Sequence, residues 1–249
     1  MSTFRSTLTP IQEAERLTHP HKILHPDIFD RHNEMYPVIR QKILRKVDFL
    51  FNKGLNKIAG LKLKDVILVG SCANYLYKEK SDFDVYGVVE NQSSPLFPKS
   101  GKPLNRALGA IGRSNLDHRA KFYCLTRFCD IRFINDYSYI ISGIYSIKNN
   151  QWIREPSQEL TSKFSATEVV DNFIKKCQEI DDFYDSFQLK NGKFTYEECQ
   201  KMSDYYVSLF NEDKSNPDNF IIFKMLDTQG VIKRIGSFVA TAYVKSLSY

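Results

Sequence analysis

The sequence predicts an α+β protein, in which a small mixed β-sheet with helices is followed by a helical C-terminal region. Short apolar runs that are rich in β-branched residues and bounded by glycine lie between residues 65 and 90, and are typical of buried strands. After Pro156 the apolar residues recur instead at helical spacing. The 249 residues, of which 42% are hydrophobic, suffice for a substantial core.

Changes in composition divide the chain into three parts. Residues 1–33 are rich in Thr, Pro and His, carry little periodicity, and predict an N-terminal arm. Residues 34–156 hold the predicted strands and form the core. Residues 157–249 form the helical C-terminal region.

The first half of the core alternates helices and strands. A helix is predicted to start at Pro37, because proline suits a first helical turn, and to end at Gly54. A buried strand is expected at 65–70, a short helix at 73–80, and a second strand at 82–90.

The second half of the core starts with a long segment, 91–117, whose prolines and glycines predict a loop. Residues 121–134 are expected to be extended. Residues 142–153 predict a hairpin that turns at Asn149-Asn150.

The C-terminal region contains two capping boxes, at 165–168 and 195–198, each of which predicts the start of an amphipathic helix. A further helical stretch is expected from about Asp218 to the C-terminus, with a break near Gly230.

Charge and composition restrict the partners and the compartment. The net charge of +6 is compatible with an anionic partner such as a nucleotide or RNA. No apolar run approaches the length of a membrane span, and the N-terminus lacks the apolar region of a secretory signal. The five cysteines form no C-x-x-C pair, which favours free thiols and a cytoplasmic protein. The oligomeric state stays open.

The segment VGSCANYLYKEKSDFDV places two aspartates one residue apart. Alternate strand residues share a face, so Asp82 and Asp84 are expected to point the same way, with Cα atoms about 6.6 Å apart. At an effective dielectric near 20, two charges ~6 Å apart repel by roughly 3 kcal/mol. Within a cleft, such a pair needs a cation.

A Gly-Ser pair precedes these aspartates at the end of the first strand. Gly70 lets a ligand approach the backbone, and the N–H groups that follow suit a phosphate. Ser71 adds a hydroxyl. Because Mg²⁺ favours a few carboxylates together with phosphate oxygens, the two segments together predict a metal–nucleotide site.

A site for two metal ions usually needs a third carboxylate, and the best candidate is Asp130 in the apolar segment FCDIRF. Such an aspartate needs a partner. The alternative is an ion pair with Arg127 or Arg132. Asp136 and Glu90 are weaker candidates for the third ligand.

The combination of Gly-Ser, a following Asp-x-Asp and a later single aspartate resembles the polymerase-β-like nucleotidyltransferase superfamily. More narrowly, the chain is similar to small predicted nucleotidyltransferases of bacteriophages. The likeness covers most of residues 24–249, and its most specific part is 69–85.

The resemblance implies a small mixed β-sheet nucleotidyltransferase core at 34–156. It implies that Asp82, Asp84 and Asp130 hold magnesium, with two ions expected and Mn²⁺ as a substitute. It also implies that Gly70 and Ser71 bind the nucleoside triphosphate. Asn74, in the first turn after Ser71, is a further candidate for nucleotide binding.

Two functions follow from this resemblance. The first is Mg-dependent transfer of a nucleoside monophosphate from an NTP to an unidentified acceptor (RNA or tRNA, protein, or small molecule), with release of pyrophosphate. The alternative is a catalytically inactive nucleotidyltransferase-fold module that binds nucleotide or nucleic acid or associates with a virion, which Arg132 beside the third acid favours. A phage-encoded protein would act in the host cytoplasm.

Overall fold

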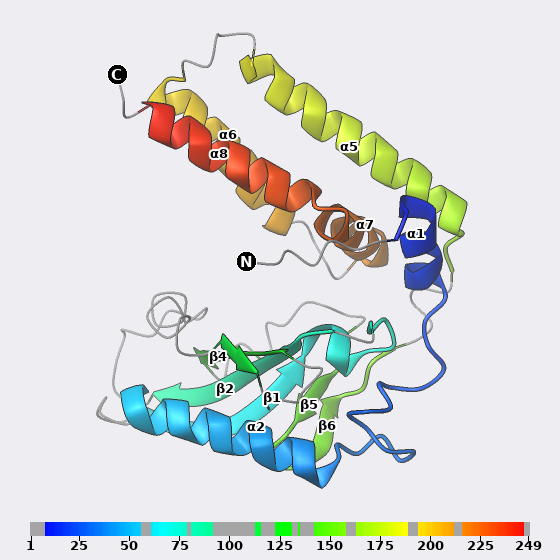
Figure 1. Ribbon diagram of the computed structural model, residues 1–249, viewed down its shortest axis with the longest axis vertical. Coiled ribbons are helices and arrows are strands. Elements are labelled where there is room, and N and C mark those ends of the chain that lie inside the picture. The colour runs from blue at the N-terminus through cyan, green and yellow to red at the C-terminus, as the bar shows by residue number, and fades with distance from the viewer. Residues whose placement is uncertain are drawn as a thin grey trace. The chain divides into compact units, whose positions relative to one another are not determined.

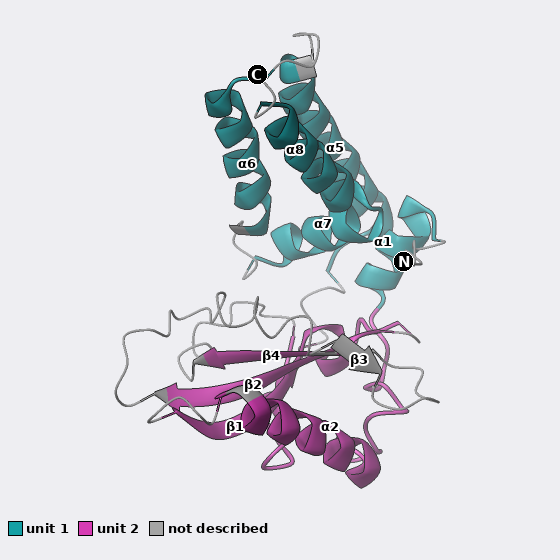
Figure 2. Cartoon of the chain, turned by 60° about the vertical axis from the view of Figure 1, so that its left-hand side comes forward, with its two compact units in different colours: residues 1–19, 159–249 teal, residues 20–158 magenta. Residues whose placement is uncertain are grey.

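The computed structural model describes residues 8–55, 61–78, 81–91, 113–115, 123–130, 134, 142–157, 163–188, 194–211 and 216–246. The chain divides into two compact units (Figure 2). The sheet unit is Pro20–Gln158, and the helical unit combines Met1–His19 with Glu159–Tyr249. The predicted α+β class is confirmed.

One six-stranded sheet forms within the described part of the sheet unit, in the order β3-β4-β2-β1-β5-β6. Only β2 and β4 run parallel, and the other neighbouring pairs are antiparallel, so the sheet is mixed as predicted. The strands are β1 (Leu61–Val69), β2 (Phe83–Asn91), β3 (Arg113–Asn115), β4 (Tyr123–Asp130), β5 (Ile144–Ser146) and β6 (Gln151–Arg154).

The main core lies between the sheet and helix α2 (Pro37–Leu50), which covers one face of the sheet (Figure 1). Pro37 occupies the first turn of α2, and a π-helical turn (Phe51–Leu55) follows the helix. Ile43, Val47 and Leu50 recur at helical spacing and are buried against the strands. The predicted first helix is thus confirmed.

The opposite face of the sheet carries a smaller apolar cluster that consists of Ile67, Val69, Val88, Cys129 and Ile144, with Tyr86 and Ile134 packed against it. Both faces of β1 are therefore buried at its C-terminal end, where four consecutive residues are inaccessible to solvent. This burial explains why the run VILV is continuously apolar rather than alternating.

The predicted hairpin is also confirmed. β5 and β6 pair antiparallel around a turn at 147–150, and Asn150 adopts a positive φ of 56°, which asparagine tolerates better than most residues. The hydroxyl of Tyr145 donates a hydrogen bond of 3.0 Å to the Asn150 side chain and fixes the turn to the buried strand.

The helical unit contains α5 (Ala166–Gln188), α6 (Tyr196–Asn211), α7 (Pro217–Thr228) and α8 (Val231–Ser246). The predicted caps form: Ser165 accepts from the Glu168 N–H, while Thr195 and Glu198 accept from each other's N–H groups. The predicted break lies at Gly230, whose φ is +78°.

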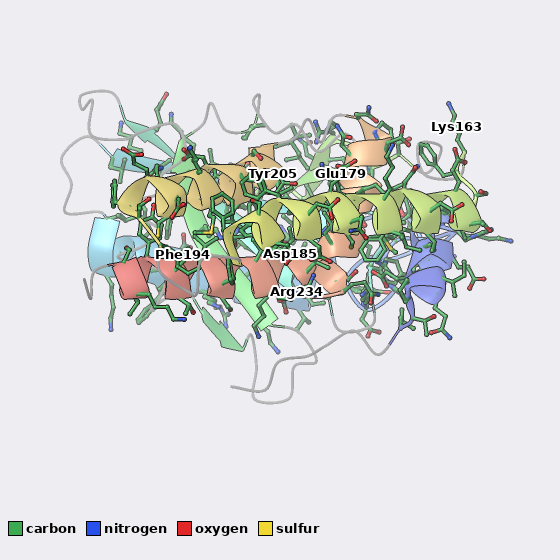
Figure 3. All side chains as sticks on the ribbon, turned by 90° about the horizontal axis from the view of Figure 1, so that it is seen from above. Lys163, Glu179, Asp185, Phe194, Tyr205 and Arg234 are labelled. Atoms are coloured by element: carbon green, nitrogen blue, oxygen red, sulfur yellow. The ribbon has the colours of Figure 1, made fainter. Side chains whose placement is uncertain are left out.

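The packing of the helical unit combines aromatic contacts with an ion pair between α5 and α8 at its surface. Phe183 of α5 stacks on Tyr205 of α6 with ring centroids 4.0 Å apart. Arg234 of α8, which Figure 3 labels, donates to Asp181 of α5 at 3.0 Å. The three helices α5, α6 and α8 are thus linked by side chains.

The N-terminal arm predicted at 1–33 is wrong for part of its length. Residues Pro10–Thr18 form helix α1, which contacts α5 and α7 and belongs to the helical unit. Thr9 and Gln12 form a capping box, and Ala14 and Leu17 are buried. A segment of nine residues is too short for its sequence pattern alone to predict a helix. α1 is stabilised instead by the helices that bury its apolar side.

Two further expectations are corrected. The short helix predicted at 73–80 is absent, because the chain forms a 3₁₀ turn, η2 (Gly70–Ala73), and then an irregular segment through residue 78. Within the loop predicted at 91–117, residues Arg113–Asn115 form β3. Residue 91 ends β2, and residues 92–112, 116 and 117, together with Arg132 and Asp136, lie outside the described residues. Among the helices described, none combines the length and the apolar character that crossing a membrane requires.

Candidate functional site

The site begins where β1 ends and the chain turns beside β2. Val69, the last residue of β1, pairs with Asp84 of β2, and Gly70 follows with a φ of +75°. A Cβ atom at Gly70 would overlap the Asp84 carboxylate, because it would meet Oδ2 and lie 3.2 Å from Cγ. Glycine is therefore required here both for the backbone conformation and for the space that the carboxylate occupies.

Cys72 joins the turn to the other aspartate. Its buried thiol Sγ donates to the backbone oxygens of Asp82 at 3.2 Å and Ser81 at 3.6 Å. Burial raises the pKa of the Cys72 thiol well above its usual value, and the carboxylates of Asp84 and Asp82 add to this shift. Cys72 is thus a protonated structural donor that holds the start of β2 against the turn.

Asp82 and Asp84 are brought together around this turn. Asp82 is exposed, Asp84 and Ser71 are partly buried, and both carboxylates act on the Cys72 thiol. Partial desolvation raises the pKa of Asp82, although the residue remains accessible to solvent. The Asp84 carboxylate thus lies against Gly70, and Asp82 is held at the same turn through its backbone oxygen.

Arg127 of β4 adds a cation to this group. Its Nη1 donates a hydrogen bond of 2.8 Å to the hydroxyl of Tyr86 and lies 3.8 Å from Asp84 Oδ1. The guanidinium carbon is 5.7 Å from the centroid of the Tyr86 ring. Arg127 and Tyr86 are partners in the parallel pairing of β4 with β2, which places these side chains next to each other.

The backbone of Asp130 lies at a different level of the sheet from that of Asp84. The β4 residue paired with Asp84 is Leu125, whereas Asp130 pairs with Val89, farther along both strands. Five residues of β4, from 125 to 130, separate Asp130 from the level of Asp84, a distance of about 16 Å along the strand. Asp82 and Asp84 are neighbours in the sequence at the start of β2, whereas the parallel register places the backbone of Asp130 at the other end of β4. The register thus gives no support to the expected convergence of the three aspartates.

Asn74 occupies a structural position. The residue is 1% exposed, its Oδ1 accepts from the Leu76 N–H at 2.8 Å, and its Nδ2 donates to Ser142 Oγ at 3.2 Å. Both ends of the amide are thus engaged inside the protein, and the side chain is almost wholly shielded from solvent. The side chain links the turn to the segment before β5, and its expected role in nucleotide binding stays a prediction.

The contribution of Arg127 and Tyr86 to the site is not visible in the local pattern. The sequence indicates Arg127 only as an ion-pair partner of Asp130, and it does not single out Tyr86. The contact of Arg127 with Asp84 depends on the register between strands that are about forty residues apart in the chain. The alternation of Asp84 and Tyr86 on one face of β2 is the one signal that could have indicated it.

The donor set fits one divalent ion better than a closed metal cage. Among the described residues, no group of three or more His, Cys, Asp or Glu side chains could hold a metal ion. Two neighbouring carboxylates nevertheless match the preference of Mg²⁺ for one or two protein carboxylates completed by water and phosphate oxygens. Asp82 and Asp84 are therefore suited to an ion that arrives with a phosphate ligand.

A second polar surface lies in the helical unit. Asn172, Lys175, Lys176 and Glu179 of α5 and Asn219 and Ile222 of α7 line an open groove of about 400 Å³. Lys176 pairs with Glu179 at 3.6 Å, so part of its charge is offset within the groove. The groove contains no pair of carboxylates and differs chemically from the site at Gly70.

Comparisons with known proteins give no match for this chain among protein-family models, curated proteins or solved structures.

Proposed function

We propose that the protein is a magnesium-dependent nucleotidyltransferase that transfers a nucleoside monophosphate from an NTP to an acceptor hydroxyl. The observation that carries this proposal is the contact between Gly70 and Asp84, with Asp82 held at the same turn by Cys72. A glycine turn beside two carboxylates provides one place for a triphosphate and one for its metal ion.

In this proposal each residue of the site has a defined task. Asp82 and Asp84 hold the metal ion, which when bound neutralises phosphate charge. The Ser71 hydroxyl and the backbone at Gly70 bind and orient the triphosphate. The acceptor oxygen forms a bond to the α-phosphorus, the bond from that phosphorus to pyrophosphate breaks, and the hydroxyl proton passes to solvent. Asp130 has no part in this step.

The acceptor belongs to one of three classes: RNA or tRNA, a protein hydroxyl, or a small molecule. The net charge of +6 favours an anionic acceptor and therefore RNA. The cysteines at 72, 124, 129, 177 and 199 are free thiols, which suits a cytoplasmic site of action, in the host cell for a phage-encoded protein.

A second candidate function is a nucleotidyltransferase-fold module that binds nucleotide or nucleic acid without catalysis, including a virion-associated role. The observation that favours it is that the β4 residues next to Asp84 are apolar or basic rather than acidic. Leu125 is the partner of Asp84, and a basic residue, Arg127, reaches that aspartate. A two-metal transfer mechanism needs further negative charge at this position.

The test is incubation of the purified protein with each α-labelled NTP, Mg²⁺ or Mn²⁺, and a cell lysate as the source of acceptors. Transfer of label in the wild type but not in Asp82→Asn/Asp84→Asn would support the enzyme and identify the acceptor class. Circular dichroism shows whether the double variant is folded.

Calorimetry with Mg-NTP separates the two candidates when no label moves. Metal-dependent binding that is lost in Asp82→Asn, without transfer, would support the inactive module. Absence of both binding and transfer would contradict both functions.

A further inference from the structure

Arg127 places a positive charge beside one of the two aspartates, Asp84. The guanidinium lies 3.8 Å from Asp84 Oδ1, and its Nη1 is hydrogen-bonded to the Tyr86 hydroxyl at 2.8 Å. Tyr86 in turn packs against the buried cluster on this face of the sheet. Arg127 is therefore hydrogen-bonded to a side chain that is itself packed against the sheet.

The geometry leaves Arg127 room to change partners. The side chains of Arg127 and Asp84 are 41% and 31% exposed, so the pair faces solvent on one side. An ion pair in such a setting is weak and exchanges readily for a stronger anion. A triphosphate presents several oxygens to a guanidinium, which binds phosphate in a bidentate manner.

Charge balance then limits the number of metal ions. Asp82 and Asp84 carry two negative charges, and Arg127 offsets one of them before any ligand binds. A second Mg²⁺ beside the first would place its two positive charges near the guanidinium, with no third carboxylate among the described residues of this group. The site thus differs from the two-ion arrangement that the family resemblance implies.

We propose that Arg127 is a built-in cation of this site. It occupies Asp84 when no ligand is present, and it binds triphosphate oxygens when a nucleotide enters with a single divalent ion. The inference rests on the proposed nucleotide function, and it assigns to Arg127 the role that a second metal ion would otherwise have. Arg127 therefore competes with the metal ion alone, but assists the metal–nucleotide complex.

Opposite effects of one substitution test this role. We use Mn²⁺ as the probe and count unbound Mn²⁺ by electron paramagnetic resonance, first without nucleotide. Arg127→Gln should bind Mn²⁺ alone about threefold to fivefold more tightly than the wild type, because the competing cation is gone. With Mn-ATP the wild type should bind one Mn²⁺ per chain, and Arg127→Gln should bind Mn-ATP about tenfold more weakly.

Two further variants and a control complete the experiment. Arg127→Lys retains the charge and should restore weak binding of Mn²⁺ alone, while only partly restoring Mn-ATP binding because lysine lacks the planar fork. Tyr86→Phe removes the oxygen that positions Arg127 and should shift both affinities in the direction of Arg127→Gln. Arg45→Gln, on the exposed side of α2, should change neither affinity.

The outcomes separate this inference from the proposed function. Unchanged Mn²⁺ affinity in both Arg127→Gln and Tyr86→Phe would overturn the inference, as would two Mn²⁺ ions per wild-type chain with ATP. If the wild type failed to bind any nucleotide, the proposed function would be contradicted, while binding of Mn²⁺ alone would still show whether Arg127 competes for Asp84.

Discussion

The Asp84 carboxylate lies directly against the backbone of Gly70, in the space that a Cβ atom would take up. Gly70 has a φ of +75°, and the antiparallel pairing of Val69 with Asp84 determines which side chain it meets. This contact thus connects the turn after β1 to a carboxylate on β2. Substitution of this glycine should therefore strain the backbone of the turn and displace the Asp84 carboxylate.

Gly70→Ala should lower the free energy of unfolding by about 2–4 kcal/mol, because a left-handed alanine costs about 1–2 kcal/mol and the contact with Asp84 adds strain. Urea denaturation measures this change. Gly230→Ala is the matched control, since Gly230 has a φ of +78° and open space where a Cβ atom would lie. It should lose only the backbone contribution, and equal losses in the two variants would contradict the role of the carboxylate contact.

Asn74→Ala should lower the free energy of unfolding by about 1–3 kcal/mol, because the Leu76 N–H and the Ser142 hydroxyl lose their partner in a buried setting. Nucleotide affinity, measured by calorimetry on the folded protein, should stay within about twofold of the wild type. Asn149→Ala, at an exposed turn position, serves as the control for stability. A large loss of nucleotide affinity in folded Asn74→Ala would restore this residue to the binding site.

Asp82→Asn should raise the thermal midpoint at neutral pH in the absence of metal. Desolvation raises the pKa of Asp82 in the folded protein, so the folded state favours the protonated form relative to the unfolded chain. That contribution to stability is present below the unfolded pKa of about 3.9 and is lost as the pH rises through the folded pKa.

The thermal midpoint of Asp82→Asn should therefore exceed that of the wild type as the pH rises above about 4, and the difference should vanish at lower pH. Scanning calorimetry of both proteins from acidic to neutral pH measures it. Lower stability of Asp82→Asn at pH 7 without metal would contradict the conclusion that desolvation of the Asp82 carboxylate destabilises the folded protein.

Arg40 connects α2 to the hairpin turn. Its Nε donates to the Ile147 oxygen and its Nη2 to the Lys148 oxygen, both at 2.6 Å. Arg40→Ala should therefore cost about 1–3 kcal/mol of unfolding free energy in urea denaturation. Arg45→Ala on the exposed side of the same helix should change it by less than about 0.5 kcal/mol. A similar loss in both variants would show that the hydrogen bonds to the turn contribute nothing specific.

Much of the secondary structure follows from local patterns. The helix from Pro37, the hairpin at Asn149-Asn150 and the helix break at Gly230 each depend on residues close together in the chain. Capping boxes likewise mark α5 and α6. The local pattern after Gly70 predicts a helix, but the segment forms a 3₁₀ turn followed by irregular chain, because Asn74 and Cys72 satisfy backbone groups through buried contacts that such a pattern does not show.

The sequence by itself determined the α+β class, the glycine turn at the end of a buried strand, and the proximity of Asp82 to Asp84, since all of these depend on neighbours within about fifteen residues. The tertiary structure alone decided which β4 residue meets that pair. The parallel register aligns Leu125 with Asp84 and Arg127 with Tyr86, and moves Asp130 to the far end of the strand. Register between strands distant in the chain is fixed by the packing of both sheet faces, which no local spacing encodes.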